Sequence, residues 1–151
     1  MHKKTRKNGF SLIELLIVVA IILIIAAIAI PNYLNAKMSA NEASAVSSIH
    51  AVNTAEITYS SVNPTIGFSA TLVALGPTAG GYLDDSLAAG NKSGYAFTYA
   101  PTGTTPYVAY TFNADPNSRY ITGKRSFYSD SSNIIHYNES AAAVVTDPVI
   151  Q

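Results

Sequence analysis

The chain has 151 residues, which suits one ordinary domain and leaves too little sequence for two full hydrophobic cores. It has nine Lys and Arg residues and nine Asp and Glu residues, but four of the nine basic residues lie within residues 1–9. The remaining 142 residues therefore carry five basic and nine acidic side chains, a balance of −4 that argues against nucleic-acid binding by phosphate neutralisation. Cysteine is absent, which excludes disulfide bonds and thiolate metal sites.

A polar, basic leader, residues 1–9, precedes a long apolar run from Phe10 to Ile30. Only Ser11 and Glu14 interrupt this run. As a helix it would be about 31 Å long, which matches the roughly 30 Å hydrocarbon core of a bilayer. Basic residues before such a span hold the N-terminus in the cytoplasm. We expect residues 10–31 to form a half-helix that spans the membrane once.

The helical pattern continues through residues 32–62, which are rich in Ala, Ser, Asn and Glu and contain no glycine or proline. Apolar residues such as Ile49 and Val52 recur there at helical spacing, as in a helix that packs on a sheet. Pro64 disfavours helical backbone at the residue before it. The pattern predicts one nearly continuous helix over about residues 11–61.

The second half of the chain reads as a connector followed by strands. Residues 63–94 hold six glycines and two prolines and predict a loop, with a short helix near residues 86–89. Residues 95–140 contain β-rich runs, two of which flank a turn-forming segment at residues 130–133. The tail, residues 141–151, is expected to be irregular. The fold class is therefore α+β, with a long helix packed on a small antiparallel sheet of three or four strands.

One short motif carries most of the functional information. It is similar to the signature of type IV prepilins: a basic leader ending in glycine, then phenylalanine, an apolar run, and glutamate at the fifth position after the cleavage point. In that family a membrane prepilin peptidase cuts after the glycine and methylates the new amino terminus. The resemblance implies cleavage between Gly9 and Phe10 and N-methylation of Phe10. The residues that carry it are Lys7-Asn8-Gly9-Phe10-Ser11-Leu12-Ile13-Glu14-Leu15-Leu16.

The residue types in the motif also have physical reasons. Gly9 has no side chain, so its backbone suits a narrow protease cleft. An acidic residue central in a membrane span costs about 2.5–3.5 kcal/mol, and less near an end, so we expect Glu14 to pair with the Phe10 amine of a neighbouring subunit during assembly. Pro31 lies where prepilins often have proline, and it removes a hydrogen bond to the carbonyl of Ala27, which predicts a helix kink or a locally melted turn. Two explanations stay open, unwinding when the helix packs into a filament and a simple bend where the helix leaves the membrane.

Two other interpretations of the N-terminus were weighed. Ala27-Ile28-Ala29 matches the cleavage site of an ordinary signal peptide, but the apolar run exceeds the usual 7–15 residues or so, and a glutamate near its start is unusual. A plain signal anchor holding a periplasmic domain would explain the hydrophobicity. It would leave the spacing of Gly9, Phe10 and Glu14 unexplained.

The chain offers no recognisable catalytic or metal motif. Its histidines, His2, His50 and His136, are far apart in sequence. Asp84-Asp85 and the segment from Asp130 could supply oxygen ligands to calcium, but Asp130 fits better as a turn residue. We therefore predict no enzymatic activity, no cofactor and no metal.

Two functions share the prepilin signature: a type IV pilus subunit and a pseudopilin of a type II secretion system. Major pseudopilins resemble one another in an Asp-Pro-Trp-Gly segment and an acidic calcium loop. This chain has no tryptophan, and its Asp-Pro pairs, Asp115-Pro116 and Asp147-Pro148, are followed by Asn and Val. The departure favours a pilus subunit, which serves adhesion, motility, aggregation or DNA uptake.

The resemblance also implies the partners and the location. The partners would be further copies of the chain in a helical homopolymer, the prepilin peptidase and methylase, and an inner-membrane assembly platform and motor. The chain would sit in the inner membrane before assembly and in a cell-surface fibre afterwards. Many pilins close their C-terminal loop with a disulfide. Here we expect hydrogen bonds and packing around Tyr120, Phe127, Tyr128 and Tyr137 instead.

Overall fold

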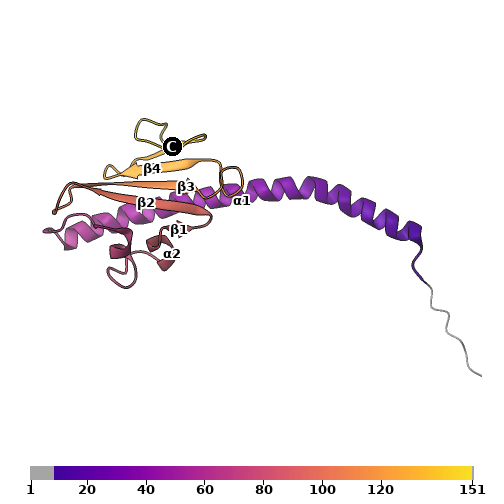
Figure 1. Cartoon of the computed structure of the whole chain (residues 1–151), viewed down its shortest axis with the longest axis horizontal. Helices are drawn as coiled ribbons and strands as arrows, with labels where there is room; N and C mark the ends of the chain where they lie inside the picture. Colours follow the sequence, from indigo (N-terminus) through magenta and orange to yellow (C-terminus); the bar gives the residue numbers. More distant parts are fainter. Residues whose placement is uncertain (1–8, 151) are drawn as a thin grey trace, which may run out of the picture. The chain divides into compact units, whose positions relative to one another are not determined.

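The computed structural model describes residues 9–150 (Figure 1). The chain divides into two compact units, residues 1–36 and residues 37–151, and helix α1 (Leu12–Val62) contributes to both. The predicted helix over residues 11–61 is confirmed to within one residue at each end. The second unit is called the head below.

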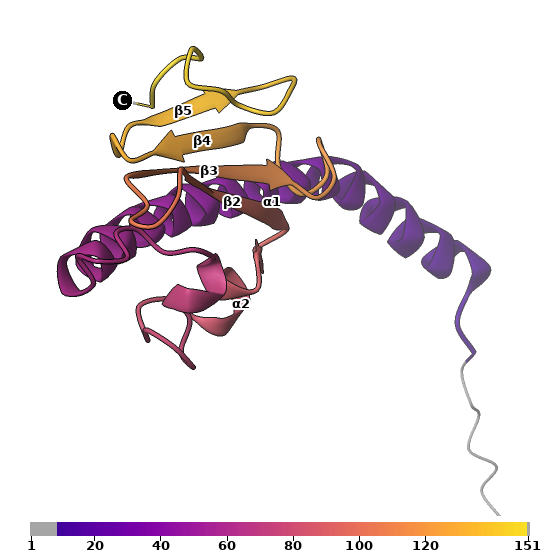
Figure 2. The same ribbon diagram turned by 60° about the vertical axis from the view of Figure 1, so that its left-hand side comes forward.

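In the head, α1 packs on a five-stranded antiparallel sheet with the order β1-β2-β3-β4-β5 (Figure 2). The α+β prediction is confirmed. The four longer strands lie in the region predicted to be β-rich, while the two-residue β1 and a 3₁₀ turn were expected to be loop. The elements after α1 are the 3₁₀ turn η1 (Leu72–Leu75), α2 (Asp85–Ala88), β1 (Asn91–Lys92), β2 (Tyr95–Thr102), β3 (Ala109–Pro116), β4 (Ser126–Asp130) and β5 (Ile135–Asn138).

The core lies between one stripe of α1 and the inner face of the sheet. Ile49 and Val52 are fully buried on the helix side. Alternate residues of β3, Tyr110 and Phe112, point inward from the sheet, as the two-residue period of a strand requires. Phe112 stacks on Phe97 with 5.5 Å between the ring centroids. Aromatic packing of this kind accounts for several of the ten tyrosines and five phenylalanines.

A buried carboxylate ties the connector to the helix. Glu56 is fully buried on α1 and accepts hydrogen bonds from the backbone N–H of Ser69, at 2.9 Å, and from the Ser69 hydroxyl. The Ser69 carbonyl in turn accepts from the Tyr99 hydroxyl at 2.8 Å. Burial raises the pKa of the Tyr99 phenol well above its usual value, so it remains a protonated donor. Helix, connector and strand β2 thus share one polar network inside an apolar core.

A second carboxylate ties α1 to the start of β4. One oxygen of Glu42 accepts from the backbone N–H groups of Lys124 and Arg125, and the other accepts from Arg125 Nε at 2.8 Å. Burial raises the pKa of the Glu42 carboxyl, but these hydrogen bonds outweigh it and the net pKa is lowered. The Arg125 guanidinium also lies 5.5 Å from the ring centroids of Phe127 and Tyr137.

The C-terminal tail is irregular, as expected, but it is firmly held. The Arg119 guanidinium donates to the carbonyls of Lys124, Glu139 and Ala141, at 2.6, 3.1 and 3.0 Å, and to the Ser126 hydroxyl at 2.7 Å. Further along, the backbone pairs with β5 through Tyr137 N–H to Pro148 O and Ile150 N–H to Ile135 O, both 2.9 Å.

The sequence predicted hydrogen bonds and packing around four aromatic residues at the tail, and of these Tyr137 does pair with the tail through its backbone N–H. Phe127 is fully buried, whereas Tyr120 is exposed in a loop and does not hold the tail. A planar guanidinium with five donors satisfies several carbonyls at once, and Arg119 is the residue holding the tail that the prediction did not name.

Replacing Glu56 should destabilise the head. In Glu56→Ala the Ser69 N–H loses its acceptor inside the core, which costs about 1–3 kcal/mol for an unsatisfied buried donor. Chemical denaturation of the detergent-solubilised full chain, followed by tyrosine near-UV circular dichroism, measures this loss. Ser47→Ala, on the exposed side of the same helix, is the matched control and should change little. Equal stability of the two variants would contradict the assignment.

The Glu42 clamp should make the head sensitive to acid. The pKa of Glu42 in the folded state lies below its ordinary value of 4.5, so its stabilising contribution is complete above that value. The contribution disappears as the pH falls through the lowered folded pKa. Glu42→Gln should be less stable than the natural chain at neutral pH and should lose less further stability on acidification.

The control for this comparison is Glu139→Gln, because Glu139 pairs with Lys124 at the exposed surface. Denaturation midpoints measured over a range of pH separate the two variants. If the natural chain and Glu42→Gln lost stability in parallel as the pH falls, the Glu42 clamp would not be the source.

Candidate processing and assembly site

The start of α1 has one half of a capping box, which the sequence pattern offered and the predictions above did not include. The backbone N–H of Ser11 donates to Glu14 Oε2 at 3.0 Å, and the Ser11 carbonyl accepts from the N–H of Leu15 at 3.3 Å. A serine followed three residues later by glutamate is the sequence signature of this cap, so the signal was present. A carboxylate in the first turn also interacts favourably with the helix dipole. Glu14 therefore has a partner within its own chain.

Gly9 and Phe10 lie just before this cap and outside the helix, which begins at Leu12. A Cβ atom added to Gly9 would meet no other atom within 4 Å, and its φ is not in the left-handed region. Nothing in the fold of the chain therefore requires glycine at this position. The Phe10 side chain is 89% exposed. The part of Gly9 in processing therefore stays a prediction.

The first half of α1 presents an apolar surface all round. Its large aliphatic side chains from Leu12 to Ile30 are each between 45% and 81% exposed. By length and composition this part of the helix is able to cross a membrane. Among residues 9–150, no other helix meets the same test. A helix that is hydrophobic on every side needs lipid or other helices around it.

The structure brings together only part of the predicted site. Gly9, Phe10 and Glu14 lie within one short segment, whereas Pro31 lies in the interior of α1. Residues on both sides of Pro31 are helical, and the kink stays a prediction. The basic leader side chains and His2 lie outside the described residues.

The side chains considered for metal binding have other partners. Asp84 caps α2 by accepting from the Leu87 N–H at 3.0 Å and pairs with Lys92 at 2.7 Å. The hydrogen bond from Lys92, together with others, holds the pKa of Asp84 well below its usual value. Asp130 accepts from the Ser132 N–H at 2.8 Å, which fits its predicted turn role. Within residues 9–150, no three His, Asp or Glu side chains are grouped as metal ligands.

The two histidines of the head are also separated. His50 lies on the exposed side of α1, and His136 lies in β5 with its Nδ1 atom 2.7 Å from the Asp147 carbonyl oxygen. The candidate site of this chain is therefore the N-terminal segment with its apolar helix, and the head shows no comparable cluster in the part that the structure covers.

Comparison with known proteins agrees with this location. Residues 4–30 match the family model described as the prokaryotic N-terminal methylation motif. A stretch of 51 residues is 49% identical to the type IV major pilin protein PilA of Myxococcus xanthus (strain DK1622), covering 34% of this chain and 23% of that protein. No solved structure matches the chain.

These matches confirm the resemblance drawn from the motif. The N-terminal segment of the chain is similar to that of type IV prepilins, and the long helix and antiparallel sheet form an α+β arrangement consistent with the pilin fold. The aligned stretch covers less than a quarter of the relative's length. The fold of the head is therefore described from the structure of this chain alone.

Proposed function

We propose that this chain is the structural subunit of a type IV pilus, which polymerises through the first half of α1 into an extracellular fibre. The observation that supports this most directly is the apolar half-helix, whose large aliphatic side chains are exposed in the described part of the chain and which follows a segment that matches the N-terminal methylation motif. The relative whose N-terminal segment is similar is described as a major pilin. The lack of tryptophan favours a pilus over a secretion pseudopilus.

The proposed sequence of events begins in the inner membrane, with the N-terminus in the cytoplasm. A prepilin peptidase hydrolyses the Gly9–Phe10 bond, which removes the four basic residues of the leader and leaves an amine on Phe10 for methylation. An assembly platform and motor then move the subunit out of the bilayer. The half-helix exchanges lipid contacts for contacts with other copies, so its burial is retained throughout. The role is structural, with adhesion, motility, aggregation or DNA uptake as fibre activities.

Glu14 and Pro31 have separate proposed roles. The Glu14 carboxylate pairs with the Phe10 amine of a neighbouring copy and sets the register of the bundle, because an unpaired charge among packed aliphatic side chains is costly. Pro31 lacks the N–H that would bond to the Ala27 carbonyl, and the helix bends or loosens there when packed.

The proposal is tested by mass spectrometry and electron microscopy of material sheared from cells. We expect thin fibres whose main protein begins at N-methylated Phe10, because the Gly9–Phe10 bond is the predicted cleavage point. The same peptide restricted to the inner-membrane fraction, with no fibres, would favour a pseudopilin. A mature N-terminus at Ile30 would exclude the prepilin interpretation.

A pair of Glu14 variants separates charge pairing from helix capping. Glu14→Gln keeps an oxygen acceptor for the Ser11 N–H, while Glu14→Ala removes both the acceptor and the charge. If the carboxylate pairs with an amine, both variants should lose most fibres while remaining membrane-inserted. Fibre yield relative to total processed protein is the measurement. Normal yield for Glu14→Gln would mean that capping alone explains this residue.

A further inference from the structure

One loop of the head presents two apolar side chains outward. Tyr120 and Ile121, between β3 and β4, are 62% and 64% exposed. The N–H of Tyr120 donates to the Gly123 carbonyl at 2.8 Å. The N–H groups of Ile121 and Thr122 donate to the Ser118 carbonyl at 3.1 and 2.8 Å. Because these bonds close the loop on itself, the exposed pair is held in place and loses little conformational freedom on contact with a partner.

This loop lies at the end of the head that the chain enters first. The head begins at Lys37. About one helical turn later on α1, the side-chain amide of Asn41 donates to the Thr122 carbonyl at 2.7 Å. In Figure 2 the connection that follows β3 lies beside α1. Tyr120 and Ile121 therefore lie near the point where the head is attached to the rest of the chain.

A short stretch of chain limits how far this end of the head can move from a membrane. The expected span is residues 10–31, so Lys37 follows it by six residues. Six residues measure about 9 Å as a helix and at most about 22 Å when fully extended. Two apolar side chains would hold a free head to lipid only weakly, but a tether of this length gives them a high effective concentration at the bilayer surface.

The loop has residue types that membrane interfaces favour. Tyrosine is enriched where hydrocarbon meets headgroups, because its ring is apolar and its hydroxyl is polar. Ile121 adds an aliphatic side chain next to Tyr120. Residues 116–125 contain three basic and no acidic side chains, and two of the basic ones pair with carboxylates, which leaves a local charge of +1. Phosphate headgroups therefore do not repel the loop.

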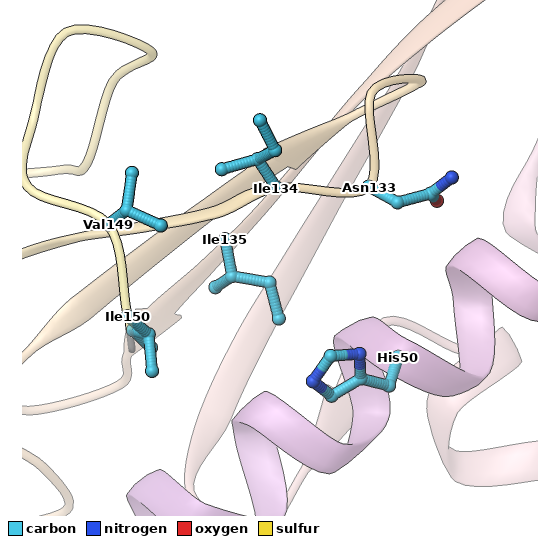
Figure 3. Close-up of a pocket in the computed structure, with 6 residues that line it drawn as sticks. All are labelled: His50, Asn133, Ile134, Ile135, Val149 and Ile150. Atoms are coloured by element: carbon cyan, nitrogen blue, oxygen red, sulfur yellow. The ribbon is translucent and has the colours of Figure 1, made fainter.

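A second apolar surface of the head lies farther from the attachment point. It is an open hollow of about 450 Å³ beside His50 (Figure 3). In Figure 3 the side chains of Ile134 and Val149 stand around the hollow, and the His50 ring faces it from α1. His50 follows Asn41 by nine residues, or about 14 Å along the helix. Of the two surfaces, the loop is the one next to the tether.

Val108 provides a matched position at the opposite end of the sheet. Its side chain is 75% exposed. Val108 directly precedes β3 and the loop follows β3, so the eight residues of that strand, about 27 Å, lie between them. A reporter at Val108 therefore samples an exposed apolar position far from the tether.

We propose that, before assembly, the Tyr120–Ile121 loop rests in the interfacial layer of the bilayer that holds the apolar half-helix. The partner of the loop is lipid: Ile121 contacts the upper acyl chains, and the Tyr120 hydroxyl stays at the level of the headgroups. The loop leaves this layer when the subunit is taken out of the membrane. The inference rests on the membrane stage of the proposed function and does not require the fibre.

Because the natural chain has no tryptophan, one introduced tryptophan reports on a single position. The full-length variants Ile121→Trp and Val108→Trp are reconstituted at high dilution in vesicles of phosphatidylethanolamine and phosphatidylglycerol, with part of the lipid brominated near the top of the acyl chains. Bromine quenches tryptophan fluorescence only at short range. Ile121→Trp should lose most of its fluorescence, whereas Val108→Trp should keep it. Equal quenching at both positions, or at neither, would overturn the inference.

A second variant shows whether the natural loop, and not the introduced tryptophan, makes the contact. Tyr120 has a φ of 65°, in the left-handed region that asparagine adopts more readily than tyrosine. Tyr120→Asn should therefore keep the loop folded while removing the ring, and circular dichroism checks the fold. Added to Ile121→Trp, it should reduce the quenching by bromine. Unchanged quenching would mean that tryptophan alone seeks the lipid, which contradicts the inference.

The outcomes separate this inference from the proposed function. Fibres that begin at Phe10, together with an unquenched Ile121→Trp, would overturn the lipid contact alone. An Ile121→Trp spectrum that shifts with protein density but is not quenched by bromine would assign the loop to a second copy and also overturn it. Quenching in a chain that forms no fibres on cells would support the contact and overturn the pilus subunit. Failure of the full chain to enter the vesicles would overturn both.

Discussion

Within residues 9–150, the large aliphatic side chains in the first half of α1 are exposed. Between Leu12 and Ile30 this half-helix exposes 14 of them. At about 1.5–3 kcal/mol for a fully exposed side chain taken out of water, and with these side chains 45–81% exposed, their burial is worth on the order of 10–30 kcal/mol. A domain of this size is stable by only about 5–15 kcal/mol. The free energy of burying this helix therefore matches or exceeds the stability of the head, and the half-helix must lie in lipid or among other helices.

The head has no cysteine, so its small sheet and long tail are held without disulfide bonds. Its core is apolar and aromatic, but its cross-links are polar. Glu42 joins α1 to the start of β4, Glu56 joins α1 to the connector, and Arg119 joins the loop before β4 to the tail. Every buried side-chain nitrogen or oxygen in residues 9–150 has a hydrogen-bond partner. Because satisfied buried networks are sensitive to loss of any member, these three residues are expected to tolerate little change.

Local patterns were sufficient for the elements and insufficient for these cross-links. The long helix follows from an uninterrupted apolar run and then a stripe that includes Ile49 and Val52, and the strands follow from alternation. The partners of Glu42 lie more than 80 residues away in sequence, and Glu42 on a helix looks like any solvated side chain. Arg119 donates to backbone carbonyl groups, and every residue has one. No sequence motif therefore predicts these hydrogen bonds. The fifth strand also could not be predicted from the sequence, because β1 has only two residues and forms only by pairing with β2.

The hydrogen bond from the Ser11 N–H to the Glu14 carboxylate links this local structure to assembly. Before cleavage, Glu14 already has the Ser11 N–H as a partner, which reduces the cost of placing a carboxylate near the end of a membrane span. Under the proposed function, cleavage creates an amine on Phe10, directly before Ser11. The Glu14 carboxylate can then accept from the Ser11 N–H of its own chain or pair with the Phe10 amine of a neighbouring copy. The second partner comes within reach only when the helices pack into a bundle. Under the proposed function, charge pairing at Glu14 is linked to the burial of the aliphatic surface, and one assembly step both removes the half-helix from lipid and sets its register.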